Sequence, residues 1–366
     1  MIERGVLYIV DPSADSVNQH VLTLLKYLNR ARYKPYLVVS NDEFLIEHAK
    51  KMRIDYISVP GITTANKLSV GGVAKQIQEF AEGLSVSLIH SHGYQACYVA
   101  SQVAKALNVP HLSTIHTINT SHQKKGLLSL SDDKIAALPN YLIAVSEEVR
   151  KTVDGINKIA LVYNGIEMER FGETLDTEHL FRELGITKEH SLIGTIARLS
   201  SDKGTSIFLE AAAILAKERP EAHFVIVGDG EEANSLKKKA AGLGIADKVH
   251  FLGFRRDVAH ILKSLDVVVI PNLSPGLPMV LLEALASIKP VVITDIPGVR
   301  EAVAEDSVDF VPVNDPQAIA GAVEELLTDR RKAEAKAQTG QRIVKEKFTI
   351  QKMIKATESL YLELAG

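Results

Sequence analysis

The sequence predicts an α/β protein made of two doubly wound parallel sheets that face a cleft. Three observations carry this prediction. Short apolar, β-branched runs recur along all 366 residues, helical patterns fall between them, and one polar stretch divides the series. Uninterrupted apolar runs are typical of parallel strands that are covered on both faces. Alternating strands and helices are typical of right-handed crossovers within such sheets.

The expected strands form two sets, and each set is large enough for one sheet. The first set comprises Val6–Val10, Tyr36–Val39, Tyr56–Val59, Ser87–His90, His111–Ile115, Tyr141–Val145 and Ala160–Tyr163. The second set comprises Leu192–Ala197, His223–Val227, Val249–Leu252, Val267–Ile270, Val291–Thr294 and Asp309–Val313.

Helical spacing supports the same organisation. A first helix is predicted because apolar side chains recur on one face from Val17 to Leu28. The polar stretch between Asn164 and His190 lacks a strand and marks the seam between domains. Beyond Gly340 the sequence predicts a final amphipathic helix. We expect domains over residues 1–168 and 169–345, followed by a separate helix over 346–366.

Composition excludes several classes of protein. Hydrophobic residues make up 46% and charged residues 24%, as in ordinary globular domains, so a disordered chain or a rod is excluded. The net charge of −3 argues against a nucleic-acid-binding protein, which would carry a strongly basic domain. No apolar run approaches 18 residues, and the single cysteine, Cys97, permits no intrachain disulfide. We therefore expect a cytoplasmic protein, and no oligomeric state is predicted.

Charge divides unevenly along the chain. Residues 1–164 hold 17 Lys/Arg and 14 Asp/Glu (+3), which leaves 25 and 31 (−6) for the rest. A basic first half, with Lys124 and Lys125 in an expected loop, is compatible with an anionic acceptor or with peripheral contact at the inner face of a membrane. Chance is the alternative, because basic membrane sites usually cluster 4–8 such residues.

Two cations follow one expected strand of the second half. Arg198 and Lys203 lie in the segment 194–204, which reads as a strand, a short loop and a helix start. Gly204 permits a close turn of the backbone there. Two fixed cations suit an anionic leaving group such as a diphosphate, whose charge grows as a bond breaks. A solvated loop with ordinary surface charges is the alternative.

A second segment, 271–286, joins a buried strand to a helix through a turn-rich loop. Pro278 fits the first helical position, and a helix N-terminus preceded by Gly276 is suited to bind an anion. Glu283 is the single acid within the apolar run 279–286. An acid among apolar neighbours is rarely left unpaired. It can accept hydrogen bonds from vicinal hydroxyls, such as those of a ribose; a salt bridge to a neighbouring helix is the alternative.

Other strand ends carry glycine or histidine. Gly228 follows a strand, and a tight turn is the favoured interpretation because the dinucleotide-binding glycine pattern is absent. His116 follows an expected strand and is placed to face the cleft; a structural histidine is the alternative. The spacing of His90 and His92 is compatible with metal ligation, but no Cys or acid lies at ligand spacing beside them. We predict no metal site.

Taken together, these segments resemble the GT-B glycosyltransferases, and specifically the large retaining family 4 (group 1 glycosyltransferases). The matching pieces keep the order and spacing of the family. They are dense from Ala144 to Pro312 and sparse in the first half, where they are limited to Ile89–Gly93 and Thr114–Thr117. The denser pieces are Val162–Glu167, Arg198 with Lys203-Gly204, Val227–Gly230, Val249–Gly253, Gly276–Ala284, Pro290–Val292 and Pro297–Glu301.

The resemblance implies transfer of a sugar from a nucleotide-diphosphate donor, with a UDP-sugar favoured, and retention of the anomeric configuration. It implies a glycan, lipid or small-molecule acceptor and a role in cell-envelope polysaccharide synthesis, with no metal or other cofactor. Arg198 and Lys203 would neutralise the leaving diphosphate, and His116 would contact the donor sugar.

The resemblance also assigns binding roles. The first domain would bind the acceptor, the second the donor, and the final helix would pack back on the first domain. The implied donor-binding set is Gly228, Phe254, Ser274, Gly276, Leu277, Pro278, Met279 and Glu283. The implied acceptor-side set is Asp15, Ser16 and His92.

Three positions depart from the family pattern. Pro275 stands where the family has the first Glu of a paired-acid motif, so one contact to the donor sugar is missing unless Ser274 replaces it. Asp15-Ser16 stand where Gly-Gly is common before His20-Val21, and a carboxylate there would repel a donor phosphate. Ile288 stands where a glycine is usual.

These departures leave other functions open. One is a degenerate family member that binds a nucleotide or glycan without catalysis. Another is a GT-B enzyme of a different reaction type, such as an epimerase or a phosphorylase-like enzyme, although no lysine context for pyridoxal phosphate is evident.

Overall fold

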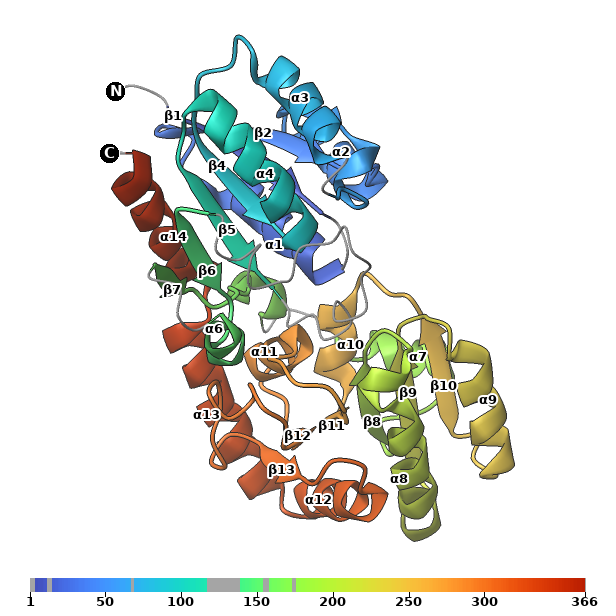
Figure 1. Ribbon diagram of the computed structural model, residues 1–366. Helices are drawn as coiled ribbons and strands as arrows, with labels where there is room; N and C mark the ends of the chain where they lie inside the picture. The colour runs from blue at the N-terminus through green and yellow to red at the C-terminus, as the bar shows by residue number, and fades with distance from the viewer. Residues whose placement is uncertain are drawn as a thin grey trace. The chain divides into compact units, whose positions relative to one another are not determined.

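The computed structural model describes residues 4–11, 15–66, 69–116, 139–153, 158–172 and 176–365, without the side chains of Asp15, Ser16 and Thr152. The chain divides into two compact units (Figure 1). Unit 1 comprises Met1–Gly165 with Ile350–Gly366, and unit 2 comprises Ile166–Thr349. The chain therefore changes unit at residues 165/166 and 349/350, a few residues from the expected limits of 168 and 345.

Unit 1 contains a seven-stranded sheet in the order β3-β2-β1-β4-β5-β6-β7, and all of its pairings are parallel. The strands alternate with helices along the chain, which is why the sheet is doubly wound. The strands are β1 (Arg4–Val10), β2 (Tyr33–Val39), β3 (Asp55–Ser58), β4 (Val86–His92), β5 (His111–Ile115), β6 (Tyr141–Ala144) and β7 (Ile159–Leu161).

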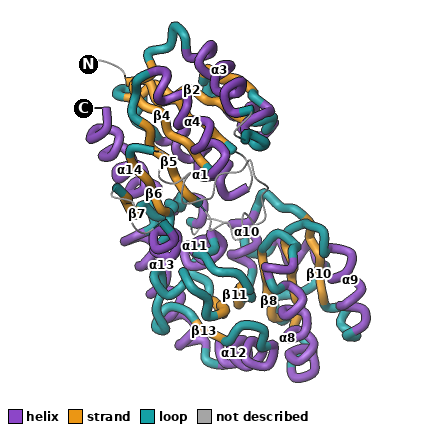
Figure 2. Tube along the Cα trace, in the orientation of Figure 1, coloured by secondary structure: helices purple, strands orange, loops and turns teal. Residues whose placement is uncertain are grey.

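Helices cover both faces of this sheet (Figure 2). One buried cluster joins the sheet to α3 (Val70–Ala81), α4 (Tyr94–Leu107) and α6 (Glu147–Thr152). The other joins it to α1 (Asp15–Tyr27), α2 (Glu43–Lys51) and α14 (Ile350–Ala365). The apolar stripe expected from Val17 to Leu28 is the buried face of α1.

The final helix, α14, is fixed to unit 1 by a buried tyrosine. The hydroxyl of Tyr361 lies 2.9 Å from the Tyr8 hydroxyl and 2.6 Å from Nδ1 of His90. The ring of Tyr361 also packs edge-on against Tyr33. Because buried polar groups are costly without partners, this network fixes α14 in one register on the sheet.

Unit 2 contains a six-stranded parallel sheet in the order β10-β9-β8-β11-β12-β13. The strands are β8 (Ser191–Ile196), β9 (Ala222–Val227), β10 (Val249–Gly253), β11 (Val267–Ile270), β12 (Val291–Thr294) and β13 (Asp309–Val311). The helices are α7 (His179–Leu184), α8 (Thr205–Glu218), α9 (Ala233–Gly242), α10 (Val258–Ser264), α11 (Met279–Ala286), α12 (Pro316–Thr328) and α13 (Arg330–Lys347).

The predicted fold class is confirmed, because every expected strand is present and lies in the expected sheet. The ends of strands differ from prediction by up to three residues, as at β2, which begins at Tyr33 because Lys34 and Pro35 continue its pairing with β1. Among the described helices, none combines the length and the apolar character that a membrane span requires.

Candidate functional site

The sequence-predicted donor residues of unit 2 lie at one edge of its sheet. Segments 197–204, 228–232, 254–257, 271–278 and 295–298 follow the carboxyl ends of β8, β9, β10, β11 and β12 in turn. In open parallel sheets, ligands bind beyond this edge. Unit 2 therefore gathers the candidate donor residues where its topology favours a ligand.

Arg198 is exposed and unpaired. No hydrogen bond or ion pair joins its guanidinium to another described residue. Its backbone, in contrast, is held on both sides, since Ala197 N donates to Val227 O (3.0 Å) and Leu199 N to Asp229 O (2.8 Å). A fixed backbone that presents a free guanidinium is suited to bind an anion.

Glycines make this arrangement possible. A Cβ at Gly228 would lie 1.8 Å from the carbonyl oxygen of Ala197, and one at Gly230 would lie 2.3 Å from that of Leu199. Gly228 also has φ +130°, outside the range that most residues adopt. The favoured interpretation of this run as a tight turn fits the structure, and the turn positions the Arg198 backbone.

Lys203 belongs to a small polar cluster that sequence reasoning missed. Lys203 Nζ lies 2.9 Å from Asp202 Oδ2, and the hydroxyl of Ser274 donates to the same oxygen at 3.3 Å. Burial opposes ionisation of Asp202, but hydrogen bonds from Ser200 and Lys203 and the charges of Lys203 and Arg198 lower its pKa to about 2. Asp202 therefore carries a charge and joins the Lys203 segment to the Ser274 loop.

Gly204 brings these two loops together. It has φ +66°, and a Cβ there would lie 1.9 Å from the carbonyl oxygen of Pro271. Leu273 N also donates to Asp202 O at 2.9 Å. The glycine that the sequence marks for a close turn is thus required for contact between segments that are far apart in the chain.

The N-terminus of α11 carries no side-chain cap. Pro278 is the N-cap residue, so the helix begins at Met279, one position later than predicted. The N–H of Gly276 donates to Pro297 O at 2.9 Å and is therefore occupied. The donors left for an anion belong to the first turn of the helix, where the helix dipole favours negative charge.

Glu283 lies half-buried on α11 without a partner. No hydrogen bond or ion pair joins its carboxylate to any described residue, so the alternative of a salt bridge to a neighbouring helix finds no support there. Burial raises the pKa of Glu283, and the positive charge of Arg170 partly offsets that shift. Arg170 precedes Phe171 in a short 3-10 turn (Met168–Phe171), and no sequence signal identified it.

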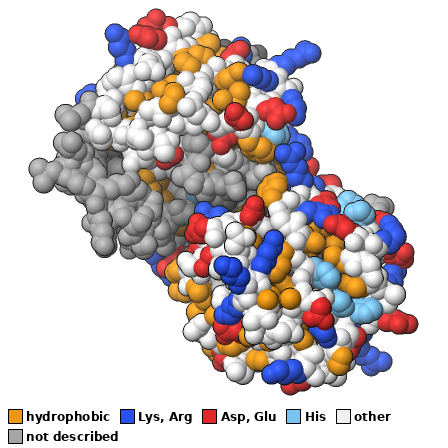
Figure 3. Space-filling model, turned by 90° about the vertical axis from the view of Figure 1, so that its right-hand side faces the viewer, with side chains coloured by type: hydrophobic (Ala, Val, Ile, Leu, Met, Phe, Trp, Pro, Cys, Tyr) orange, Lys and Arg blue, Asp and Glu red, His pale blue; other side chains and the backbone are white. Residues whose placement is uncertain are grey.

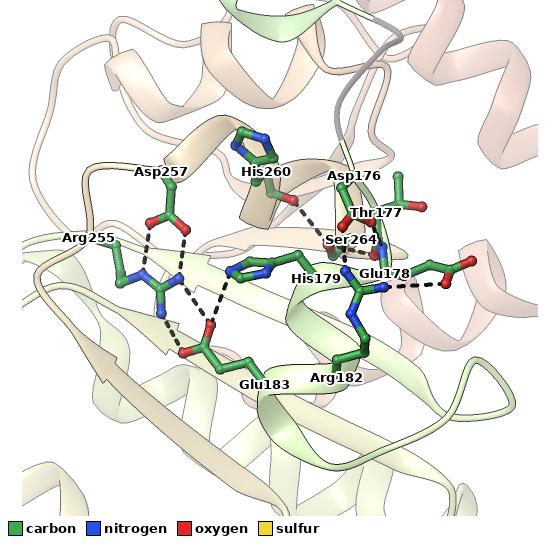
Figure 4. A network of polar contacts seen from close by, with 10 residues as sticks. All are labelled: Asp176, Thr177, Glu178, His179, Arg182, Glu183, Arg255, Asp257, His260 and Ser264. Carbon is green, nitrogen blue, oxygen red and sulfur yellow. Dashed lines mark hydrogen bonds and ion pairs between the residues drawn. The ribbon is translucent and has the colours of Figure 1, made fainter.

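Phe254 is 71% exposed, the largest exposure among the apolar side chains described as exposed. It follows β10 and directly precedes Arg255, which is held by four hydrogen bonds (Figure 4). Arg255 donates to Asp257 at 2.6 and 2.8 Å and to Glu183 of α7 at 2.6 and 3.1 Å. The network fixes the backbone next to an exposed aromatic ring, which is suited to stack on a flat ligand.

The candidate residues of unit 1 are histidines that lie close together. His116 directly follows β5 and is partly exposed, whereas His92 ends β4 with 0% exposure. His92 Nδ1 and His116 Nε2 are 3.2 Å apart. His20 of α1 completes the cluster, with ring centroids 4.7 Å from His116 and 5.4 Å from His92. Sequence reasoning did not single out His20.

The structure describes the other predicted residues of unit 1 only in part. Asp15 and Ser16 begin α1, but their side chains lie outside the described set, as do Lys124 and Lys125 entirely. His90 is a core residue with partners at both ring nitrogens, which contact Tyr361 and Thr114. His111 is also buried, and its Nε2 contacts the Ser91 hydroxyl, whereas its Nδ1 has no partner among the described residues.

Bulk charge does not mark the site. On the face shown in Figure 3, acidic and basic side chains are interspersed. With 25 Lys/Arg against 31 Asp/Glu from residue 165 onward, this half of the sequence is acidic overall. An anion bound by unit 2 would therefore rest on local groups, for which Arg198, Lys203 and the α11 N-terminus are the candidates.

Comparisons with known proteins give a consistent family. A family model described as "Glycosyl transferases group 1" matches residues 176–343, and one described as "Glycosyltransferase Family 4" matches residues 17–170. The chain is 32% identical over 273 residues to a D-inositol 3-phosphate glycosyltransferase of Corynebacterium urealyticum, covering 68% of this chain and 64% of that protein. It is 28% identical over 302 residues to an uncharacterized glycosyltransferase of Methanocaldococcus jannaschii, covering 76% of each.

Solved structures agree on the fold. The Anabaena protein HepE, determined in complex with UDP and glucose, superposes with a TM-score of 0.84 at 19% identity and covers 99% of this chain and 100% of that one. The lipopolysaccharide outer core galactosyltransferase WaaB superposes with a TM-score of 0.74 at 14% identity, over 99% and 100% of the two chains. These likenesses confirm the GT-B architecture. The chain belongs to glycosyltransferase family 4, the group 1 glycosyltransferases, and is a glycosyltransferase enzyme.

Proposed function

We propose that this protein is a retaining glycosyltransferase that needs no metal and transfers a sugar from a UDP-sugar. In this proposal unit 2, close to the expected domain 169–345, binds the donor. Unit 1, close to the expected 1–168 with the final helix 346–366, binds the acceptor. The observation that carries it is that unit 2 holds both a guanidinium, at Arg198, and a carboxylate, at Glu283, that make no hydrogen bond or ion pair with any described residue.

The cations act on the leaving group. As the bond from the sugar C1 to the diphosphate oxygen breaks, negative charge grows on the diphosphate. Arg198 is unpaired and ready to meet that charge, whereas Lys203 is held by Asp202 and must share its charge. The first-turn N–H groups of α11 add partial positive charge. Fixed donors of this kind stabilise a transition state because they need no reorganisation.

The carboxylate acts on the nucleoside. Glu283 has no partner among the described residues, and its unpaired oxygens can accept two hydrogen bonds from vicinal ribose hydroxyls. Phe254 offers an exposed ring for the base. Gly228, Gly276, Leu277, Pro278 and Met279 supply the loop backbone around the diphosphate, and Ser274 stands in for the family's missing acid.

The acceptor supplies the nucleophile of the reaction. Its hydroxyl oxygen forms the new bond to C1, and its proton leaves with the departing diphosphate. His116, which is partly exposed, contacts the donor sugar, and Asp15, Ser16 and His92 lie on the acceptor side. Relatives named for UDP-galactose transfer to a lipid diphosphate and for lipopolysaccharide core synthesis support a glycan or lipid acceptor of the cell envelope.

The proposal is tested by donor consumption. Purified protein is incubated with UDP-glucose, UDP-galactose and UDP-N-acetylglucosamine in chelator, with and without simple acceptors, and UDP release is followed. The expected result is transfer, or slow hydrolysis, of at least one donor. No UDP release from any common nucleotide sugar would contradict it.

A non-catalytic binding protein is the second candidate, and Pro275 favours it. Pro275 is exposed in the loop before α11 and supplies no carboxylate. The variant Pro275→Glu separates the two functions. Robust activity of the natural sequence rules out the non-catalytic function, whereas activity that appears only in the variant supports it.

A further inference from the structure

Three histidines of unit 1 form a cluster with the geometry of a metal site. One ring nitrogen each from His20, His92 and His116 lies within 4.8 Å of the other two. The residues come from α1, the end of β4 and the segment after β5, so the sheet and one helix hold the rings in place. The site lies entirely within unit 1.

The closest pair already has the spacing of two ligands. His92 Nδ1 and His116 Nε2 are 3.2 Å apart. Two nitrogens bound to one tetrahedral Zn²⁺ at about 2.0–2.1 Å lie roughly 3.3 Å from each other. The third nitrogen, from His20, lies within 4.8 Å of the other two, so its ring must move closer to complete the set.

The hydrogen bond between His92 and His116 fixes where the protons must go when an ion binds. In the ligand-free protein one of His92 Nδ1 and His116 Nε2 carries a proton and donates it to the other. Binding of an ion at these two atoms places the ring protons on His92 Nε2 and His116 Nδ1, which are buried and have no hydrogen-bond partner among the described residues. Each neutral imidazole offers one nitrogen lone pair, and the neutral form of histidine is the one that binds metals. The nearby His90 is excluded because Tyr361 and Thr114 occupy both of its nitrogens.

A neighbouring amide orients the third ring. His20 Nδ1 lies 2.8 Å from Asn164 Oδ1, and a carbonyl oxygen can only accept, so Nδ1 carries the proton. Nε2 of His20 is then left with its lone pair. Metal-binding histidines commonly donate their second nitrogen to an oxygen in this way.

We propose that His20, His92 and His116 form a binding site for a borderline-soft divalent transition metal ion such as Zn²⁺ or Co²⁺. Imidazole suits these ions. The remaining coordination position is left for water or a ligand oxygen. The site goes beyond the proposed function, which needs no metal. Because the ion would occupy His116, bound Zn²⁺ would lower the rate of sugar transfer.

A Co²⁺ titration tests the site without any nucleotide. The full chain, without an affinity tag and treated with chelator, is titrated while the visible d–d absorption of Co²⁺ is recorded. The expected result is one Co²⁺ per chain with the intense bands of tetrahedral coordination, displaced by Zn²⁺. In His20→Gln the affinity should fall more than about 100-fold, because one ligand is lost.

Two further variants keep the test decisive. Asn164→Ala keeps all three rings and should weaken Co²⁺ binding by about 10–100-fold, even if His20→Gln fails to fold. His223→Gln is the matched control, since His223 Nδ1 pairs with His250 Nε2 at 2.9 Å in unit 2, and it should bind Co²⁺ like the natural protein.

Three results would overturn the proposal. These are absence of a stoichiometric absorption band, a band that is unchanged in both His20→Gln and Asn164→Ala, and a band that is lost in His223→Gln. None of them bears on donor binding, which is measured with nucleotides and chelator. Failure of one proposal is therefore distinguishable from failure of the other.

Discussion

The two groups of candidate residues differ in how they carry charge. In unit 2, Arg198 is exposed, Lys203 and Asp202 form an ion pair, and Glu283 is half-buried with no partner in the part of the chain that the structure describes. In unit 1, His20, His92 and His116 are neutral and contact one another. The first arrangement suits an anion with adjacent hydroxyls, and the second suits lone-pair donation to an ion or a sugar hydroxyl. The two sheets share one strand order, apart from the additional strand β7 of unit 1. The side chains at their carboxyl edges nevertheless differ in charge and in the ligands that they suit.

The largest expected effect comes from Arg198, whose guanidinium makes no hydrogen bond or ion pair with another described residue. In Arg198→Ala, turnover should fall about 100–1,000-fold, because one preorganised charge contact to the transition state is lost. UDP release under saturating donor measures it. Arg331→Ala is the control, since Arg331 is exposed on α13 and belongs to none of the segments that follow the carboxyl ends of the strands. Unchanged turnover in Arg198→Ala would remove this residue from the mechanism.

The next effect concerns the unpaired carboxylate. Glu283→Gln keeps the shape of the side chain but weakens hydrogen bonds to the ribose. Because bonds to a charged acceptor are worth about 1.5–3 kcal/mol, KM for the donor should rise about 10–100-fold. Steady-state kinetics with a 2′-deoxy-UDP-sugar sharpen the test. The natural enzyme should discriminate against that donor, and Glu283→Gln should lose this discrimination. An unchanged KM would mean that Glu283 does not touch the nucleoside.

The same substitution should make the ligand-free protein more stable at neutral pH. Burial raises the pKa of Glu283 in the folded state, so ionisation of this carboxyl opposes folding above that pKa. At about pH 4 the carboxyl is largely protonated in both states and the cost disappears. Urea unfolding should therefore show a gain for Glu283→Gln at about pH 7 that shrinks toward about pH 4. A loss of stability at about pH 7 would reveal a structural role.

Asp202 should show the opposite pH dependence. Its pKa is lowered to about 2 in the folded state, so its contribution to stability is present above the unfolded pKa and is lost as pH falls toward about 2. Asp202→Asn should be less stable than the natural protein at about pH 6, and the difference should narrow by about pH 3. A constant difference in urea unfolding at the two pH values would mean that the charge of Asp202 is not involved.

The smallest effect concerns the backbone after α11. Ile288 has φ +56°, a left-handed conformation that is strained for a β-branched residue and that glycine adopts freely. Ile288→Gly relieves roughly 1 kcal/mol of strain but gains a similar amount of entropy in the unfolded chain. The free energy of unfolding should change by less than about 1 kcal/mol. A loss above about 2 kcal/mol would show that packing of the isoleucine outweighs its strain.

The sequence predicted what depends on neighbours along the chain. Apolar runs gave the strands, and their ends located Arg198, Gly228 and Glu283 at one edge of unit 2. Pairings between distant residues left no such signal. The contact of Asp202 with Ser274 spans 72 positions, and the approach of His20 to His92 joins a helix to a strand that is not adjacent in sequence.

The same limit applies to the histidine cluster. His90 and His92 offered no further ligand at local spacing, so the sequence predicted no metal site. The rings that lie near His92 belong to His20 of α1 and to His116 after β5, and only the folded sheet brings them together. The helix begins at Met279 rather than at Pro278, a difference of one residue, because proline is tolerated both at the N-cap and in the first helical position.

The central claim is that the strand-end loops of unit 2 bind a nucleoside diphosphate through Arg198 and Glu283, and thermal unfolding with nucleotides tests it most directly. The protein is heated with UDP, UMP, GDP or no nucleotide in chelator. A ligand at 100 times its Kd adds about 2.7 kcal/mol. The account predicts a clear rise in Tm with UDP, a smaller one with UMP, and loss of the rise in Arg198→Ala and Glu283→Gln. No rise with any nucleoside diphosphate, or an equal rise in both variants, would contradict it.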